Sequence, residues 1–103
     1  MATLSTHVLD TSRGRPAPGI GVRLEDALGE VLDEGVTDAD GRVGRLGADL
    51  ETGAYVLRFD TGTYLGPDAF YPEVAVTFRI VADEHHHVPL LLNPFGYATY
   101  RGS

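Results

Sequence analysis

Three of the four histidines in the sequence stand together, at His85, His86 and His87, directly before the apolar run 88–92. If this stretch is a strand, its side chains alternate between two faces, so His85 and His87 share one face, about 7 Å apart, and His86 lies on the other. Imidazole changes its protonation state near neutral pH, which suits proton transfer to and from a substrate. Two imidazoles at i and i+2, joined by a third from another strand, could also hold a zinc ion. These residues alone leave both chemistries open.

Four more residues could act together with this group. His7 lies on an alternating stretch, 3–10, and faces away from the expected core. Arg42 follows an acidic turn with a glycine that can reverse the chain. Tyr100 and Ser103 belong to the polar C-terminal stretch. Taken one by one, they are an exposed strand histidine, a solvated arginine after a turn and two residues of a frayed end.

Strands must position these residues, and the sequence predicts an all-β fold. Period-two alternation recurs in short stretches, and 13 glycines and 6 prolines cut the chain into short segments. Seven or eight short strands at near-regular spacing indicate a two-sheet antiparallel β-sandwich with at most one short helix, a single turn at 67–71. The expected strands are 3–10, 22–26, 31–37, 55–60, 74–81, 85–92 and 97–100, with a further extended piece after Arg42. The expected core stripes are Val74, Val76, Phe78 and Ile80 on one strand and Val88, Leu90 and Leu92 on another.

Composition narrows the class of function. A chain of 103 residues has the length of one domain, so we expect residues 1–103 to form a single domain. The 8 basic and 15 acidic residues give a net charge of −7 with no basic run, which argues against nucleic acid as a partner. The absence of cysteine excludes disulfides and thiolate catalysis. No leader is visible and no apolar run approaches the about 20 residues that span a bilayer, so we expect a soluble cytoplasmic protein without membrane contact.

Five motifs occur in a recognisable order along the chain. They are Ser5-Thr6-His7-Val8-Leu9-Asp10 with Gly14-Arg15-Pro16-Ala17, then Thr37-Asp38-Ala39-Asp40-Gly41-Arg42, Phe70-Tyr71-Pro72, His85-His86-His87-Val88-Pro89-Leu90-Leu91-Leu92 and Tyr100-Arg101-Gly102-Ser103. Together they resemble the 5-hydroxyisourate hydrolases, the transthyretin-like enzymes of urate breakdown. The resemblance runs from near residue 4 to the last residue. Each motif alone is weak evidence, whereas five in the right order are specific.

This resemblance implies a transthyretin-like sandwich assembled as a homotetramer, with active sites in a channel where subunits meet. It also implies hydrolysis of 5-hydroxyisourate to 2-oxo-4-hydroxy-4-carboxy-5-ureidoimidazoline without a metal or other cofactor. The residues that act in the family fall here on His7, Arg42, His87, Tyr100 and Ser103. His85 matches the first histidine of the same strand, and it either lies in the substrate site or supports the site by a hydrogen bond.

The residue types suit these roles. His7 and His87 are candidates for proton transfer, with the roles of base and acid not divided between them. Arg42 is planar and always charged, which fits an electron-rich ring and a developing oxyanion. Tyr100 offers a hydroxyl that could orient substrate or water, and Ser103 adds a hydroxyl and a carboxylate. Substrate contacts are expected from His7, Arg42, Tyr100 and His85.

Three positions depart from the common family pattern, since His86 replaces a tyrosine and Asn93 and Ala98 replace serines. His86 lies on the opposite face from its two neighbours, so its change is not expected to touch the site. Two rival functions remain. One is a transthyretin-like carrier of small molecules without catalysis, and the other is a metal-dependent hydrolase that uses His7, His85 and His87. Leu91 and Pro89, on the histidine face, are expected at a subunit interface.

Overall fold

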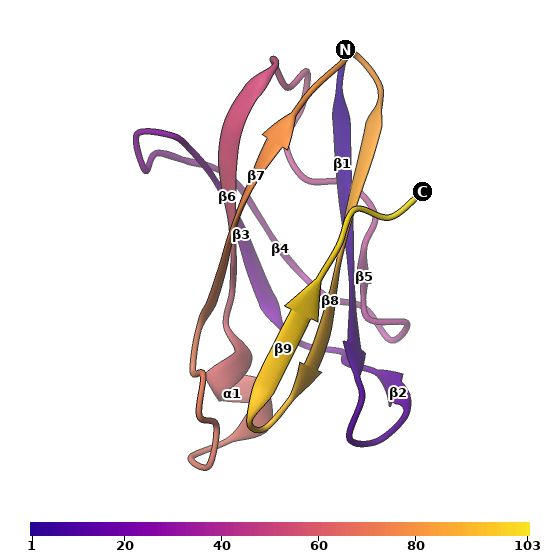
Figure 1. The fold of residues 1–103 in the computed structure, drawn as a ribbon, viewed down its shortest axis with the longest axis vertical. Helices are drawn as coiled ribbons and strands as arrows, with labels where there is room; N and C mark the ends of the chain where they lie inside the picture. The colour runs from indigo at the N-terminus through magenta and orange to yellow at the C-terminus, as the bar shows by residue number, and fades with distance from the viewer.

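The computed structural model describes residues 1–103 as two β-sheets packed face to face, with one short helix at the lower end of Figure 1. The first sheet has the order β2-β1-β8-β9, with β5 also paired to β1, and the second has the order β4-β3-β6-β7. The elements are β1 Thr3–Asp10, β2 Arg15–Pro16, β3 Gly21–Asp26, β4 Val31–Val36, β5 Arg42–Val43, β6 Gly53–Phe59, α1 Thr61–Leu65, β7 Val74–Ile80, β8 His85–Asn93 and β9 Gly96–Thr99. The all-β, two-sheet sandwich predicted from the sequence is confirmed.

The pair β1 and β8 at the centre of the first sheet is parallel. Its register places Thr3 opposite His85, Ser5 opposite His87 and His7 opposite Pro89. Every other strand pair is antiparallel. A parallel pair needs a long connection, and here the chain forms the whole second sheet between β1 and β8. The expected antiparallel sandwich therefore contains one parallel pair, and this pair decides which residues lie beside the histidines.

The core lies between the two sheets and is formed by alternate residues of each strand. It contains 18 buried apolar residues, among them Leu4 and Val8 of β1 and Leu90 and Leu92 of β8. Burying each such side chain stabilises the fold by about 1.5–3 kcal/mol. Both core stripes predicted from the sequence are confirmed, with Phe78 only half-buried. Because these residues face inward, the residues between them on β1 and β8 face outward.

The short helix lies earlier in the chain than the sequence analysis placed it. The single turn expected at 67–71 is wrong, because α1 spans Thr61–Leu65. The Asp60 side chain caps its N-terminus by accepting hydrogen bonds from the backbone N–H of Thr63 at 3.3 Å and from its hydroxyl at 2.7 Å. Gly62 donates its N–H to the Pro72 carbonyl at 2.7 Å, and a Cβ at this position would lie 2.9 Å from that oxygen. No helix of the chain is long and apolar enough to cross a membrane.

Candidate active site

The outward face of β1 and β8 gathers three histidines at one end of the first sheet. His7 comes from β1, and His85 and His87 come from β8. The parallel register places Ser5 directly opposite His87, and the period-two alternation of β1 places Ser5 on the same face as His7. His86 faces the other way and is only 3% exposed. The prediction that His86 lies on the opposite face from its two neighbours is therefore confirmed.

Two hydroxyl groups of β1 hold the imidazoles of β8. The Thr3 hydroxyl lies 2.6 Å from Nδ1 of His85. The Ser5 hydroxyl lies 2.8 Å from Nε2 of His85 and 2.7 Å from Nδ1 of His87. Both ring nitrogens of His85 are therefore engaged. Only Nε2 of His87 remains without a hydrogen bond within the chain, so this atom can act on a substrate or a water.

His7 and Arg42 are directly paired across the short ladder between β1 and β5. His7 is half-buried, and its Nε2 is enclosed without a hydrogen-bond partner. A buried polar atom without a partner is costly, which points to a ligand that completes the site. Arg42 is exposed and follows the turn Asp38–Gly41, in which the Asp38 side chain accepts the Arg42 N–H at 3.0 Å. Gly41 has φ +74°, and a Cβ there would collide with the Val8 carbonyl of β1.

The electrostatics of this face favour a neutral His87. Burial lowers the pKa of His87 below its usual value of 6.5, and repulsion from the charge of Arg42, with smaller electrostatic effects of His7 and His85, lowers it further. A hydrogen bond with the backbone of Ser5 opposes this shift only in part. The lowered pKa favours the neutral form of His87 at pH 7, and this form can accept a proton at Nε2 when Nδ1 carries the ring hydrogen.

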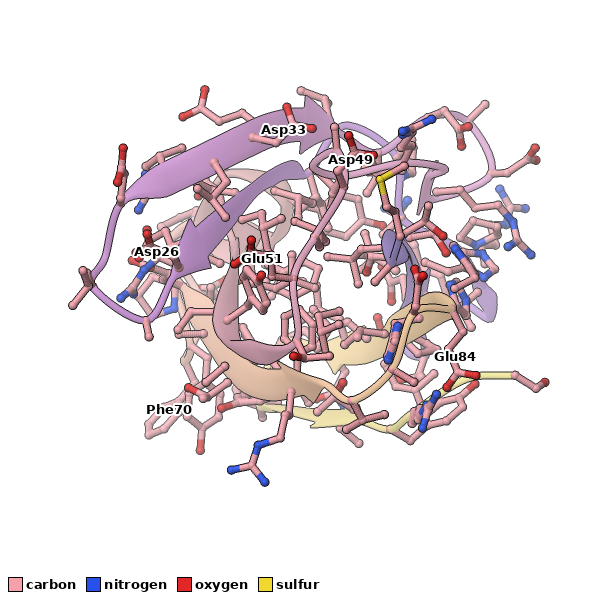
Figure 2. The ribbon with its side chains drawn as sticks, turned by 90° about the horizontal axis from the view of Figure 1, so that it is seen from above. Asp26, Asp33, Asp49, Glu51, Phe70 and Glu84 are labelled. Carbon is pink, nitrogen blue, oxygen red and sulfur yellow. The ribbon has the colours of Figure 1, made fainter.

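The C-terminal stretch passes over His87. Gly102 donates its N–H to the His87 carbonyl at 2.8 Å, and a Cβ on Gly102 would lie 2.5 Å from Cδ2 of the His87 ring. Arg101 binds Glu84 at 2.9 Å, and Glu84 lies beside the yellow C-terminal stretch in Figure 2. The same stretch covers Pro89, so this residue, which the sequence analysis expected at a subunit interface, is buried by its own chain.

The residues proposed from the sequence thus fall into two groups. The structure brings His7, Arg42, His85 and His87 together on one face. Tyr100 is 55% exposed, Ser103 is exposed, and neither side chain makes a hydrogen bond within the chain. The sequence analysis missed Thr3 and Ser5, which orient the two histidines of β8. The alternation that placed His7 on the outer face could have found both, since they stand two and four residues before it.

The zinc alternative has no preformed site in this arrangement. No group of three or more histidine, aspartate or glutamate side chains is placed to hold a metal ion. His85 has both ring nitrogens engaged by hydroxyls, as described above. Ligation by this histidine would require breaking at least one of these bonds.

Solved structures with the same architecture define the class of protein. The structure of Klebsiella pneumoniae 5-hydroxyisourate hydrolase is similar with a TM-score of 0.91 and 41% identity, covering 100% of both chains. Sea bream transthyretin in complex with thyroxine is similar with a TM-score of 0.88 and 30% identity, covering 96% of this chain and 93% of the other. The fold and the site therefore define the class of protein, which is a transthyretin-like sandwich with histidines and an arginine on one outer face.

Sequence comparison gives the family. The model of the HIUase/transthyretin family matches residues 4–102. A 5-hydroxyisourate hydrolase of Rhizobium meliloti is 48% identical over 114 residues, which cover 97% of this chain and 95% of the relative. The chain belongs to the HIUase/transthyretin family.

Proposed function

We propose that His7, Arg42, His87, Tyr100 and Ser103 carry out the hydrolysis of 5-hydroxyisourate on the outer face of the first sheet. The chain is a hydrolase of urate breakdown that converts 5-hydroxyisourate to 2-oxo-4-hydroxy-4-carboxy-5-ureidoimidazoline. Its similarity to 5-hydroxyisourate hydrolases over nearly the full length supports this activity.

The single observation that supports the assignment of residues is the state of His87. This imidazole is held by Ser5 at Nδ1 and has Nε2 free, beside Arg42 and the unpartnered Nε2 of His7, and burial lowers its pKa. His87 takes a proton from the attacking water, and Arg42 stabilises the negative charge that develops on the carbonyl oxygen. His7 binds the substrate through its free Nε2 and is placed to give a proton to the leaving nitrogen.

The C-terminal residues act from the edge of this site. Tyr100 orients substrate or water through its hydroxyl, and Ser103 contributes polar groups beyond Gly102, which lies against the His87 ring. His85 supports His87 through their shared partner Ser5. No metal or other cofactor is part of this proposal, and full activity after exhaustive chelation, with no metal in the purified protein, is the expected result.

The test is a rate measurement on freshly formed substrate. Urate oxidase generates 5-hydroxyisourate, and the ultraviolet signal of the intermediate is followed with the parent protein, His87→Ala and Arg42→Ala. The parent is expected to accelerate the decay strongly, and both variants to approach the spontaneous rate. Arg45→Ala is the matched control, since Arg45 is also exposed and lies three residues after Arg42. Full activity of His87→Ala or Arg42→Ala would refute the assigned roles.

The same assay separates the enzyme from a carrier. Sea bream transthyretin, bound to thyroxine, has this fold. A folded parent protein that leaves the decay unchanged would favour a carrier without catalysis. The residues that argue for the enzyme are the histidines and the terminal Tyr-Arg-Gly-Ser.

We also propose that residues 1–103 work as one domain within a homotetramer whose active sites lie at a subunit interface. An outer face that mixes imidazoles with the half-buried Leu91, and aromatic side chains exposed at one end of the sandwich, support this assembly. Location in the cytoplasm stays a prediction of the sequence.

A further inference from the structure

Four side chains on the outer face form one continuous row of hydrogen bonds. Thr3 contacts His85, His85 contacts Ser5, and Ser5 contacts His87, at 2.6, 2.8 and 2.7 Å. Hydroxyl and imidazole groups alternate along the row, in which His85 uses both ring nitrogens and Ser5 uses its single hydroxyl for two contacts. The row begins at Thr3 and the exposed His85, the first residues of β1 and β8, and ends at the half-buried His87.

Two arrangements of hydrogens satisfy all three bonds. In the first, Nδ1–H of His87 donates to Ser5, the Ser5 hydroxyl donates to Nε2 of His85, and Nδ1–H of His85 donates to Thr3. This arrangement leaves a lone pair on Nε2 of His87. In the second arrangement, donor and acceptor exchange roles in all three hydrogen bonds. Nδ1 of His87 then accepts from Ser5, so the ring hydrogen of His87 lies on Nε2. Passing one proton along the row converts the first arrangement into the second.

The reaction itself releases a proton. Water adds its oxygen to the carbonyl carbon, the carbon–nitrogen bond breaks, and one hydrogen of the water ends on the leaving nitrogen. The other hydrogen stays on the new carboxyl group, which ionises at neutral pH because such groups have a pKa near 3.5. Each turnover therefore forms one carboxylate and one N–H on the ureido nitrogen and leaves one proton to be removed from the site.

We infer that Thr3, His85 and Ser5 form a proton relay that carries this proton from Nδ1 of His87 to solvent. The inference rests on the proposed function, because it requires His87 to accept protons during hydrolysis. His87 receives a proton at Nε2 and gives up its Nδ1 proton to Ser5, and Ser5 passes its own proton to Nε2 of His85. His85 passes its Nδ1 proton to Thr3, whose hydroxyl releases a proton to solvent. After the product leaves, each imidazole exchanges its ring hydrogen with solvent and returns to its first tautomer, so Nε2 of His87 is again free to accept a proton.

The surroundings of His87 leave few other exits. Gly102 covers one side of its ring, with backbone so close that a Cβ would collide. Arg42 and His7 lie on this face, and Arg79, Tyr100 and Arg101 line a cavity that His87 also lines, so positive charge predominates around the ring. The positive charge of Arg42 disfavours a long-lived imidazolium at His87. Ser5 is buried, so water cannot replace it in the row without rearrangement of the strand pair.

The experiment compares three variants at low buffer concentration. Ser5→Ala breaks the row at its centre, His85→Ala removes its exit while keeping the bond between Ser5 and His87, and Ser5→Thr keeps the hydroxyl. Thr6→Val is the matched control, because Thr6 neighbours Ser5 but donates its hydroxyl to the Val88 carbonyl on the inner face at 2.6 Å. Free imidazole serves as an external proton carrier, added at constant pH and ionic strength.

We expect kcat to fall about tenfold to a hundredfold in Ser5→Ala and His85→Ala, within the range that positioned proton transfer contributes, with KM within about twofold of the parent. Ser5→Thr and Thr6→Val should keep most of the parent kcat. Added imidazole should raise kcat of the two impaired variants in proportion to its concentration and leave the parent unchanged.

Three results would overturn the relay. The first is a kcat of His85→Ala close to that of the parent at low buffer. The second is a loss in both impaired variants that imidazole does not relieve, which would assign Ser5 and His85 to orientation alone. The third is a rise in KM with unchanged kcat in His85→Ala, which would make His85 a substrate contact. Failure of the proposed function would be seen separately, as a folded parent protein without activity.

Discussion

His87 is the residue on which most of the site depends, and its neighbours act on it in different ways. Ser5 fixes Nδ1, Gly102 lies against the ring, and Arg42 acts through its charge. Each contact can be changed by a single substitution with a distinct result. Single substitutions of these neighbours therefore test the proposed chemistry most directly.

The first prediction concerns the titration of His87. Its pKa lies below 6.5 through burial and through the positive charge of Arg42, so Arg42→Gln should raise it. The neutral, proton-accepting form then disappears at a higher pH than in the parent. The lowered pKa means that the unfolded chain binds this proton more readily than the folded chain. The contribution of His87 to the free energy of unfolding therefore decreases as the pH falls below 6.5. NMR titration of the ring protons, assigned with His87→Ala, measures the shift, and Arg45→Gln should leave it in place.

The second prediction concerns the space that Gly102 leaves for the His87 ring. In Gly102→Ala the new Cβ would lie 2.5 Å from Cδ2 of His87, so the ring or the C-terminal stretch must move. A displacement of about 1 Å at a reacting group can cost a hundredfold in rate, and we expect kcat/KM to fall at least about tenfold. Gly96→Ala is the control, since its Cβ would meet nothing closer than 3.8 Å. Parent-like kinetics in Gly102→Ala would show that this contact is unimportant.

At the scale of elements, period-two alternation predicted the strands and the faces of their residues. It placed Val88, Leu90 and Leu92 in the core and His86 away from its neighbours, as found. It could not predict that β1 and β8 pair in parallel, because pairing depends on the path of the whole chain between them. The bonds from Ser5 to both histidines follow from that register, so they were missed.

The short helix was misplaced for a different reason, because a local sequence signal for it was present and was not used. The sequence analysis ended a strand at residue 60 and placed a helical turn at 67–71. The capping residue Asp60, with Thr63 three residues later, is a local signal that could have been used. The contact of Gly62 with Pro72 is tertiary, and no local pattern predicts it.

The third prediction concerns how the turn between β7 and β8 holds the C-terminal stretch. Glu84 in this turn pairs with Arg101 at 2.9 Å, and His86 accepts the Val81 N–H at 3.3 Å while its Nδ1 lies 3.0 Å from the Glu84 carbonyl. Exposed ion pairs contribute about 0.2–1 kcal/mol, so Glu84→Gln should lower kcat/KM by no more than about fivefold. High salt should lower the parent activity towards that of the variant, since salt screens exposed charges.

Glu73→Gln is the control for this ion pair. It removes a partner of Arg58 at the same distance of 2.9 Å, where Arg58 lies on β6 of the second sheet and Glu73 directly precedes β7. Its activity and its response to salt should equal those of the parent. Equal kinetics of Glu84→Gln and Glu73→Gln at low salt would count against a positioning role of Glu84.

At the scale of the whole molecule, one end of the sandwich exposes a cluster of aromatic side chains. Tyr71 packs edge-to-face on Phe70 at 4.9 Å and on Tyr97 at 5.2 Å, and Phe95 in the turn between β8 and β9 is 76% exposed. Phe70 projects from the body of the chain in Figure 2. The net charge of −7 is spread over the remaining surface without a basic run. An apolar cluster of this kind, on an otherwise charged surface, is typical of an interface between subunits.

The last prediction uses this cluster to link assembly to activity. Phe95→Glu places a charge on the exposed aromatic end proposed as a subunit contact and should convert four-chain particles into smaller ones, because burying an unpaired charge is costly. If the active site is complete only in the assembly, kcat/KM should fall with the mass of the particle as the protein is diluted. Leu28→Glu is the matched control, since Leu28 is 94% exposed on the turn between β3 and β4. Light scattering and the rate assay at the same concentrations measure both quantities. A fully active single chain of Phe95→Glu would show that each subunit holds a complete site.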